Sequence, residues 1–420
     1  MNREELKRYT VVQQVMDHQL TAKEAAQTLG LSHRQIFRLK DKVAREGETG
    51  VIHKNRERKP AHAIPEHIRD QVIGLLASDR YRNCNDVHFA ELLAKHEAIH
   101  ISPATVRRIR VGAQIKPKRK RRPSNVHRPR ERRSQAGQLV QMDASPHHWL
   151  EDRSGRISLH AAIDDATGKV VGAVFRPEED LKGYFMITQQ MLELEGIPMS
   201  LYSDRHMIFQ SPREKQTIEE ELAGEPVPLS QFGQALDDLG VTHVKAMTPQ
   251  AKGRVERLFQ TLQDRWVVEL RLRGIQTIEE ANQVLPALID EHNRQFAQEP
   301  LEDDSAFIPL QDGQYPEQIL CYRAQRVLGA GETIAYKGKT YKIQTVEQQS
   351  IIPLKTRVSV RETLGGQMFV WYNGVSYPLQ ETARPKPKPK EKTGHAKGPR
   401  TPARDHPWRQ YNISRVPQRT

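Results

Sequence analysis

Residues 138–168 read QLVQMDASPHHWLEDRSGRISLHAAIDDATG, and here the pattern of the chain changes from helix to strand. The first part is a short apolar run that ends in Asp143. Residues 156–164 alternate apolar and polar positions, as a half-buried strand does. Asp165 to Gly168 gives a turn signal, after which VVGAVF continues as the next strand. The stretch therefore predicts that a β-sheet starts near residue 138.

The segment beyond this start alternates between helix and strand. The order of three strands, helix, strand, helix, strand, helix is typical of an α/β layered domain with a mixed sheet, here of five strands. Residues 210–228 are polar and charged and are interpreted as an inserted loop. The later elements are expected at 181–195 (helix), 198–204 (strand), 230–239 (helix), 241–246 (strand) and 251–274 (helix). The apolar face of the last helix carries Val255, Leu258, Leu262, Trp266 and Leu270.

Residues 20–43, LTAKEAAQTLGLSHRQIFRLKDKV, predict a helix-turn-helix within a helical triplet over 5–46. Thr21 and Ser32 can each cap a helix, with Glu24 and Gln35 reaching back three positions on. Gly30 lies between the two helices, where a tight turn needs a residue that accepts positive φ.

The second of these helices carries the residues that could read DNA. His33, Arg34 and Arg38 are expected to face outward and meet a major groove. The alternative is a plain helical hairpin with a charged outer face. Two capping boxes around a turn of this length favour DNA binding.

Residues 65–112 predict a second helix-turn-helix, with weaker signals. Pro65 opens a helix with Ile68, Val72, Leu75 and Leu76, and a second helix carries Val87, Leu92 and Leu93. In the third, ISPATVRRIRVGA at 101–113, Ser102 is a good cap and Pro103 suits the first turn. The short helix is loaded with positive charge, and its predicted DNA-binding residues are Arg107, Arg108 and Arg110.

The positive charge of the chain lies on two arms. Residues 116–133 hold ten Lys or Arg and one Glu, a net charge of +9, and residues 381–420 hold eleven and three acids, a net charge of +8. The whole chain carries +13, so the rest is near −4. Basic runs can simply keep a chain soluble, but next to helix-turn-helix units they favour DNA binding through counterion release. The predicted contacts of the first arm are Lys118, Arg119, Lys120, Arg121 and Arg122.

The bulk composition limits the classes of protein. A length of 420 residues predicts three or four domains, and an apolar share of 37% leaves part of the chain as arms or linkers. No apolar run approaches 18 residues, so we expect a cytoplasmic protein that makes no contact with a membrane. Cys84 and Cys321 make neither a disulfide framework nor a Cys-x-x-Cys zinc motif. After residue 310, Lys337-Gly338 and Asn373-Gly374 are turn signals between short strands, which indicates a small β barrel.

Three acids form the candidate catalytic site. Asp143 and Asp204 each end a predicted strand, and Glu256 lies one turn into the long helix. Strand ends meet at one edge of an α/β sheet, and carboxylates held close together repel unless a hard cation such as Mg²⁺ or Mn²⁺ binds them. Two such ions about 3.5–4 Å apart can activate an attacking oxygen and stabilise a leaving one.

Several neighbours compete with this interpretation or add to it. Asp164 and Asp165 are alternative acids, but they lie in a turn signal where an Asp caps the turn. His147 and His148 are interpreted as structural or loop residues. Lys252, four residues before Glu256, shares its helical face and could hold a phosphate. Arg254 is included among the predicted DNA contacts.

QMDAS at 141–145, YSDRH at 202–206 and TPQAKGRVERLFQTLQDR at 248–265 resemble the motifs of bacterial insertion-sequence transposases with a retroviral-integrase-like core. SPHHWLEDR at 145–153 resembles the ISNCY type in particular. The resemblance covers roughly residues 10–300 and implies an RNase H-like fold. By motif position it assigns the three acids as ligands of two divalent ions per active site. The interval of 52 positions from Asp204 to Glu256 exceeds that of the broader integrase pattern, and the insert at 210–228 accounts for the difference.

The resulting hypothesis is a DNA transposase of the Asp-Asp-Glu type in the bacterial cytoplasm, at the nucleoid. It binds the terminal repeats of a mobile element, cleaves the ends, joins the 3′ hydroxyl to target DNA, and assembles on DNA as a dimer or higher oligomer. The alternatives are a catalytically inactive helix-turn-helix regulator and an RNase H-type nuclease. The predicted domains are helix-turn-helix units at 1–48 and 60–113, a basic linker at 114–134, the catalytic core at 135–300, the barrel at 310–380 and a basic disordered tail at 381–420.

Overall fold

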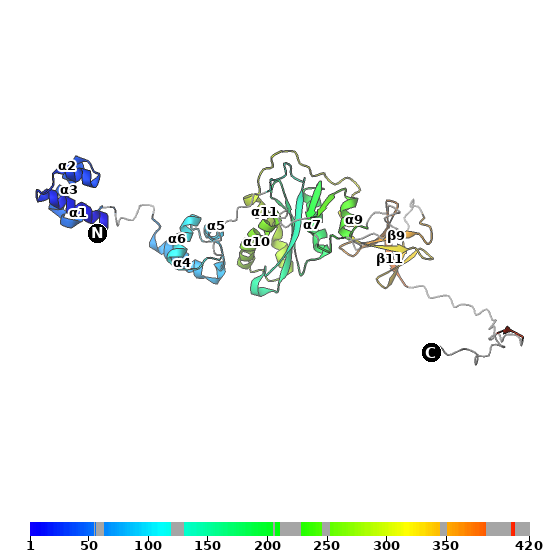
Figure 1. The fold of residues 1–420 in the computed structure, drawn as a ribbon. Helices are drawn as coiled ribbons and strands as arrows, with labels where there is room; N and C mark the ends of the chain where they lie inside the picture. The colour runs from blue at the N-terminus through cyan, green and yellow to red at the C-terminus, as the bar shows by residue number, and fades with distance from the viewer. Residues whose placement is uncertain are drawn as a thin grey trace, which may run out of the picture. The chain divides into compact units, whose positions relative to one another are not determined.

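A computed structural model describes residues 1–53, 55, 63–118, 130–204, 206–210, 228–245, 253–344, 351–383 and 405–407 (Figure 1). The chain divides into two compact units, Met1–Ser124 and Asn125–Thr420. The first unit is helical, and the second contains both sheets. Each unit is described by itself.

Three helices form the first part of the amino-terminal unit: α1 (Arg3–Met16), α2 (Ala22–Leu29) and α3 (His33–Glu46). Both predicted capping boxes are present, Thr21 with Glu24 and Ser32 with Gln35. Gly30 ends α2 in the left-handed conformation with φ 63°, as the turn requires. The helix-turn-helix pattern is therefore confirmed as a structure.

The helical packing of this first part extends past residue 48, where the sequence predicts the end of the first helix-turn-helix unit. Gly47–Val51 form the short 3₁₀ helix η1, whose Val51 packs with Val12 and Val43 in a buried cluster. A Cβ on Gly50 would lie 2.7 Å from the carbonyl oxygen of Lys42, so only glycine allows this close approach. The helical packing thus continues beyond residue 48.

The second part of this unit contains α4 (Glu66–Ala77), η2 (Asp79–Tyr81), α5 (Asp86–His96) and α6 (Pro103–Gly112). The three helices lie where the sequence predicts them, and the Ser102 hydroxyl accepts a hydrogen bond from the Thr105 amide at the start of α6. Val87, Leu92 and Leu93 lie on α5 as predicted; Leu92 and Leu93 are buried, whereas Val87 is 50% exposed.

The predicted mixed five-stranded sheet is confirmed, with strand order β3-β2-β1-β4-β5. Strands β1, β2 and β3 pair antiparallel, and β4 and β5 continue the sheet parallel to β1. The strands are β1 (Val140–His147), β2 (Ile157–Asp164), β3 (Val170–Arg176), β4 (Ser200–Ser203) and β5 (Thr242–Lys245). A 3₁₀ helix, η3 (Glu151–Arg153), lies between β1 and β2.

Helices cover both faces of this sheet (Figure 1). Residues of α7 (Leu181–Leu194) and α9 (Gln231–Asp238) share one apolar cluster with Met142 and Ala162. Residues of α10 (Gly253–Leu272) and α11 (Ile278–Phe296) share the other cluster with Leu159 and Ala161. All five residues predicted for the apolar face of α10 are buried. The layered α/β architecture is therefore confirmed, and α11 is an addition that the sequence reasoning missed.

A six-stranded antiparallel sheet, nearly closed, follows the short helix α12 (Pro316–Ile319). Its strands run in the order β6-β9-β10-β11-β8-β7. Both predicted hairpin turns are present: Lys337 and Gly338 have φ 46° and 79°, and Asn373 and Gly374 have φ 48° and 79°. The strands are β6 (Tyr322–Val327), β7 (Thr333–Tyr336), β8 (Lys339–Ile343), β9 (Arg357–Glu362), β10 (Met368–Tyr372) and β11 (Val375–Thr382).

Three further predictions concern the carboxy-terminal tail, the inserted loop and contact with a membrane. Strand β11 runs to Thr382, so the predicted tail at 381–420 starts slightly too early, and most of it lies outside the described residues. The predicted insert also lies largely outside them. Among the described helices, none has the length and apolar character needed to cross a membrane.

Candidate active site and nucleic-acid interface

Asp143 lies in β1, and Asp204 directly follows the last residue of the neighbouring parallel strand β4. Strand β1 pairs with β4 in the register Val140 to Leu201 and Gln141 to Tyr202, so each acid lies two residues beyond the second of these pairs. Asp143 is opposite Ala161 in β2, which belongs to the cluster on the α10 face of the sheet. Because directly paired residues point to the same face of a sheet, Asp143 belongs to that face.

Helix α10 lies along β1 on the same face. The Val255 amide donates to Gln141 Oε1 at 3.4 Å, and Gln263 Nε2 donates to Ser145 Oγ at 3.0 Å. Gln141 and Ser145 flank Asp143 in β1 at two residues on either side. Glu256 follows Val255 in the first turn of α10 and is exposed. The three predicted acids therefore come from elements that are in contact on one face of the sheet.

Tyr184 of α7 is a buried residue that sequence reasoning missed. The Tyr184 hydroxyl donates to Glu179 at 2.7 Å, and Glu179 lies 4.0 Å from His206 Nδ1. Burial raises the pKa of Tyr184 well above its usual value, and the negative charges of Glu179, Asp143 and Asp204 raise it further. The His206 amide donates to Asp204 Oδ1 at 2.8 Å. The helix of Tyr184 also carries polar residues such as Lys182, Gln189 and Glu193, so no signal in the sequence distinguished this residue.

The donor set at this face consists of carboxylate oxygens, which suit a hard divalent cation. Asp143 and Asp204 each lie two residues beyond the paired Gln141 and Tyr202, and Glu256 is on the helix that contacts β1. Within the described residues, however, no three acidic, His or Cys side chains stand close enough together to hold a metal ion. The three acids therefore fit such an ion in the chemistry of their oxygens, but their side chains are not gathered around one point.

The competing acids Asp164 and Asp165 have structural roles, as the sequence indicated. Asp164 Oδ2 accepts hydrogen bonds from the amide and hydroxyl of Thr167 and closes the turn, and Oδ1 accepts from the Gly137 amide. Asp165 is fully buried and lies in an ion pair with Arg254. His147 packs edge-on against the Trp149 ring at 5.5 Å, which agrees with its structural interpretation.

The structure corrects the interpretation of Arg254 as a DNA contact. Its side chain is 13% exposed; Nε donates to Asp165 at 2.6 Å and Nη2 donates to the Arg130 carbonyl at 3.0 Å. The guanidinium is thus used inside the core. Lys252 lies outside the described residues, as do Arg119, Lys120, Arg121 and Arg122, while Lys118 is partly exposed.

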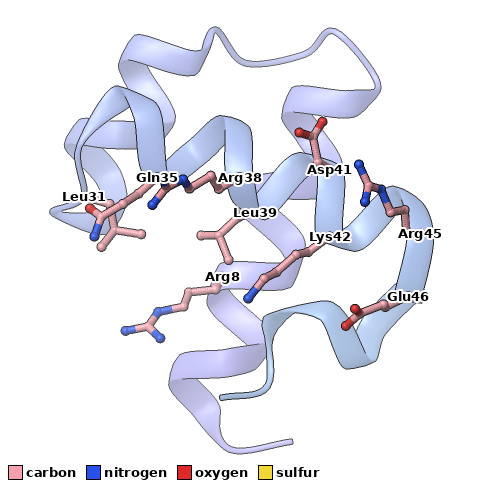
Figure 2. A pocket seen from close by; sticks show the side chains of 9 residues that line it. All are labelled: Arg8, Leu31, Gln35, Arg38, Leu39, Asp41, Lys42, Arg45 and Glu46. Carbon is pink, nitrogen blue, oxygen red and sulfur yellow. The ribbon is translucent and has the colours of Figure 1, made fainter. Parts of the chain in front are cut away.

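The predicted DNA-reading residues of α3, His33, Arg34 and Arg38, are all exposed. A hollow of about 650 Å³ lies beside Arg38 and is also lined by Arg8 of α1 and by Lys42 (Figure 2). Figure 2 shows these cationic side chains around the apolar Leu39. The full lining is Arg8, Leu31, Gln35, Arg38, Leu39, Asp41, Lys42, Arg45 and Glu46, with four cations against two acids. Sequence reasoning missed Arg8, Lys42 and Arg45.

On α6, Arg107 and Arg108 are exposed, as predicted. Arg110 is not: it is 8% exposed and donates to both carboxylate oxygens of Asp86 at 2.7 and 2.9 Å. This ion pair joins α5 to α6 within the helical unit. The prediction that Arg110 meets DNA is therefore corrected, because its guanidinium is engaged internally.

The chain is similar to two curated transposases. It is 34% identical over 384 residues to the putative transposase y4bF of Sinorhizobium fredii (strain NBRC 101917 / NGR234), which covers 90% of this chain and 81% of that protein. It is 33% identical over 401 residues to the transposase for insertion sequence IS1202 of Streptococcus pneumoniae, covering 87% and 84%. The chain therefore belongs to the transposase family.

Comparisons with family models and with solved structures give weaker similarities or none. No family model matches the chain. A chain of the simian T-cell lymphotropic virus intasome in complex with PP2A regulatory subunit B56 gamma is 14% identical, with a TM-score of 0.30, covering 71% of this chain and 96% of its own. The HTLV-2 integrase catalytic core domain in complex with magnesium is 17% identical, with a TM-score of 0.26, covering 45% and 99%. TM-scores this low do not establish a shared fold.

Proposed function

We propose that this transposase is of the Asp-Asp-Glu type, with an RNase H-like core in which Asp143, Asp204 and Glu256 are the catalytic acids. The observation that supports the proposal is the register of β1 and β4, in which Gln141 pairs with Tyr202, two residues before Asp143 and Asp204 respectively. Two contacts fix α10 along β1 on either side of Asp143. Membership of the transposase family supplies the reaction class.

The proposed reaction has two phosphoryl transfers. In the first, a water oxygen bonds to the phosphorus at the end of the mobile element, the bond from phosphorus to the 3′ oxygen breaks, and the element is left with a 3′ hydroxyl. In the second, this hydroxyl bonds to a phosphorus of target DNA in line, and the target 3′ oxygen leaves. Each step moves one proton from the attacking oxygen to the leaving one, so no oxidant or energy source is needed.

Asp143, Asp204 and Glu256 would hold two Mg²⁺ or Mn²⁺ ions. When bound, such ions supply Lewis-acid stabilisation of the attacking and leaving oxygens. The three carboxylates would supply the oxygens that hold the ions. Gln141 and Ser145 keep α10 aligned with β1 around Asp143.

The helical units are proposed to bind the terminal repeats of the element. His33, Arg34 and Arg38 on α3 would enter a major groove, with Arg8 and Lys42 beside them for phosphates. DNA would also be contacted by Arg107 and Arg108 on α6 and by Lys118 to Arg122 of the basic arm. Joining two element ends requires at least two subunits, so assembly on double-stranded DNA is part of the proposal.

The test uses the purified full chain, a library of labelled DNA ends that includes the element's own, and Mg²⁺. Asp143→Asn and Glu256→Gln are compared with wild type. We expect wild type to nick and join one end, and both variants to bind that end without doing either. Sequence-specific binding without cleavage in Mg²⁺ or Mn²⁺ would favour the regulator. Hydrolysis without joining would favour the nuclease.

A further inference from the structure

Asp165 is the centre of a buried charge network that connects three segments. Its carboxylate, with a side-chain exposure of 0%, forms ion pairs with Arg130 and with Arg254, whose Nε lies at 2.6 Å. It also accepts hydrogen bonds from Gln141 Nε2 at 3.0 Å and from the Arg133 amide at 2.9 Å. Four donors therefore converge on one carboxylate.

These partners belong to three parts of the molecule that are distant in sequence. Arg130 and Arg133 lie at the end of the basic arm, just before the core. Gln141 is two residues before Asp143 in β1, and Arg254 is two residues before Glu256 in α10. Each of the two acids thus has a near neighbour on its own element that is bonded to Asp165.

Two more contacts close the network. Gln141 uses its nitrogen on Asp165 and its Oε1 on the Val255 amide, at the start of α10. Arg254 uses Nε on Asp165 and Nη2 on the Arg130 carbonyl, which ties the helix to the arm. The first turn of α10 is therefore held through the backbone amide of Val255 and through the side chain of Arg254.

A buried ion pair is a weak source of stability, because apolar residues of similar volume often stabilise a core as well or better. A buried ion pair does, however, orient its partners, because each donor must point at the carboxylate to compensate for its loss of hydration. Around Asp165, this orientation of the donors determines where α10 begins relative to β1. That relation sets the position of Glu256 with respect to Asp143.

We infer that Asp165 is a positioning residue, which through Arg254 and Gln141 sets Glu256 against Asp143 and ties the basic arm to the same point. The inference rests on the proposed function. It predicts that loosening the Arg254 contact misplaces Glu256 while leaving the recognition of DNA ends intact. A small misplacement of a catalytic group lowers rates by about 10- to 100-fold.

The test compares Arg254→Gln with Arg271→Gln in the full chain. Arg271 is a matched control, because it makes a two-pronged ion pair with Glu151 at 2.7 and 2.8 Å from the other end of the same helix. Binding of labelled ends, rates of cleavage and joining, and hydrogen exchange of peptides covering 253–262 are measured for each. Arg254→Lys, which keeps one donor for Asp165, is the conservative variant.

We expect Arg254→Gln to bind ends like wild type, to react at least tenfold more slowly, and to exchange faster at 253–262. Arg254→Lys should recover part of the rate, and Arg271→Gln should keep the wild-type rate and exchange at 253–262. Equal loss in both Gln variants, or an Arg254→Gln rate within twofold of wild type, would overturn the inference. Wild type that neither cleaves nor joins would overturn the proposed function instead, while the exchange comparison would still decide the positioning.

Discussion

The side-chain amide of Asn293 binds both backbone groups of Val170: its Oδ1 accepts from the Val170 amide at 2.8 Å, and its Nδ2 donates to the Val170 carbonyl at 2.9 Å. Asn282, three turns earlier on α11, binds the amide and carbonyl of Phe175 in the same way. Val170 and Phe175 belong to β3, an edge strand of the five-stranded sheet. The helix thus completes hydrogen bonds that an open edge would leave to solvent or to another strand.

Replacing Asn293 with Ala should therefore destabilise the core. The change leaves two backbone groups of Val170 without their partner, at a cost of about 1–3 kcal/mol. Urea unfolding followed by tryptophan fluorescence would measure it, since Trp266 packs against the same helix through His292. Gln295→Ala is the control, because Gln295 lies on the same helix, is exposed, and bonds to Arg265 at the surface. Equal stability of the two variants would contradict this role of Asn293.

Two glycines of the helical unit should respond to alanine in opposite directions. Gly30 has φ 63° and Gly74 lies inside α4, and a Cβ at either would meet no atom within 4 Å. The effect of each alanine on stability therefore depends only on the backbone conformation at that position. Gly30→Ala should destabilise the helices around the turn by about 1 kcal/mol, whereas Gly74→Ala should stabilise α4 by about 0.5–1 kcal/mol. Hydrogen exchange of peptides from 20–46 and 66–112 would show faster exchange in the first case and slower exchange in the second.

The hollow beside α3 gives a prediction about DNA affinity. If Lys42 contacts a phosphate, Lys42→Gln should weaken binding to all sequences alike and reduce the slope of log affinity against log salt by about 1. Arg38→Gln should in addition reduce the preference for the element's own end, since Arg38 is expected in the groove. Lys7→Gln removes the same charge from an exposed position of α1 outside the hollow. A Lys7 variant with the same change in slope would argue for a general charge effect.

Local chemistry explains which parts of the fold could be predicted. The capping boxes at Thr21 and Ser32 and the turns at Lys337-Gly338 and Asn373-Gly374 depend on a few consecutive residues, so their sequence signals were sufficient. The apolar face of α10 could be predicted equally well. Helix α11 was missed, although its apolar spacing and the cap at Thr277 were present in the sequence.

The roles of individual charged residues could not be predicted in the same way. Arg110 and Arg254 look like any other cation in a basic segment, and only the tertiary position of Asp86 and Asp165 shows that both are internal. The Tyr184 hydroxyl bonds to Glu179, which lies in the loop before its helix. Such pairings depend on packing between distant segments, which sequence periodicity does not specify.

Two buried histidines predict how stability depends on pH. Burial lowers the pKa of His160 and of His292 from 6.5 to about 4 in the folded chain. The unfolded chain therefore binds more protons than the folded one between about pH 6.5 and pH 4, so the free energy of unfolding should fall as pH decreases through this window. Each histidine should contribute a loss of about 1–2 kcal/mol at pH 5 relative to pH 7.

His292→Phe isolates one of these contributions. His292 packs between the rings of Trp266 and Phe296, and its Nδ1 is buried with no hydrogen-bond partner among the described residues, so a phenyl ring can replace it without removing a bond from that atom. Urea unfolding at pH 5 and pH 7 should show a smaller difference for the variant than for wild type, by about 1–2 kcal/mol. His148→Phe, at an exposed position, should keep the wild-type difference. If His292→Phe kept it as well, His292 would be protonated in the folded chain at pH 5, and burial would not be what controls its charge.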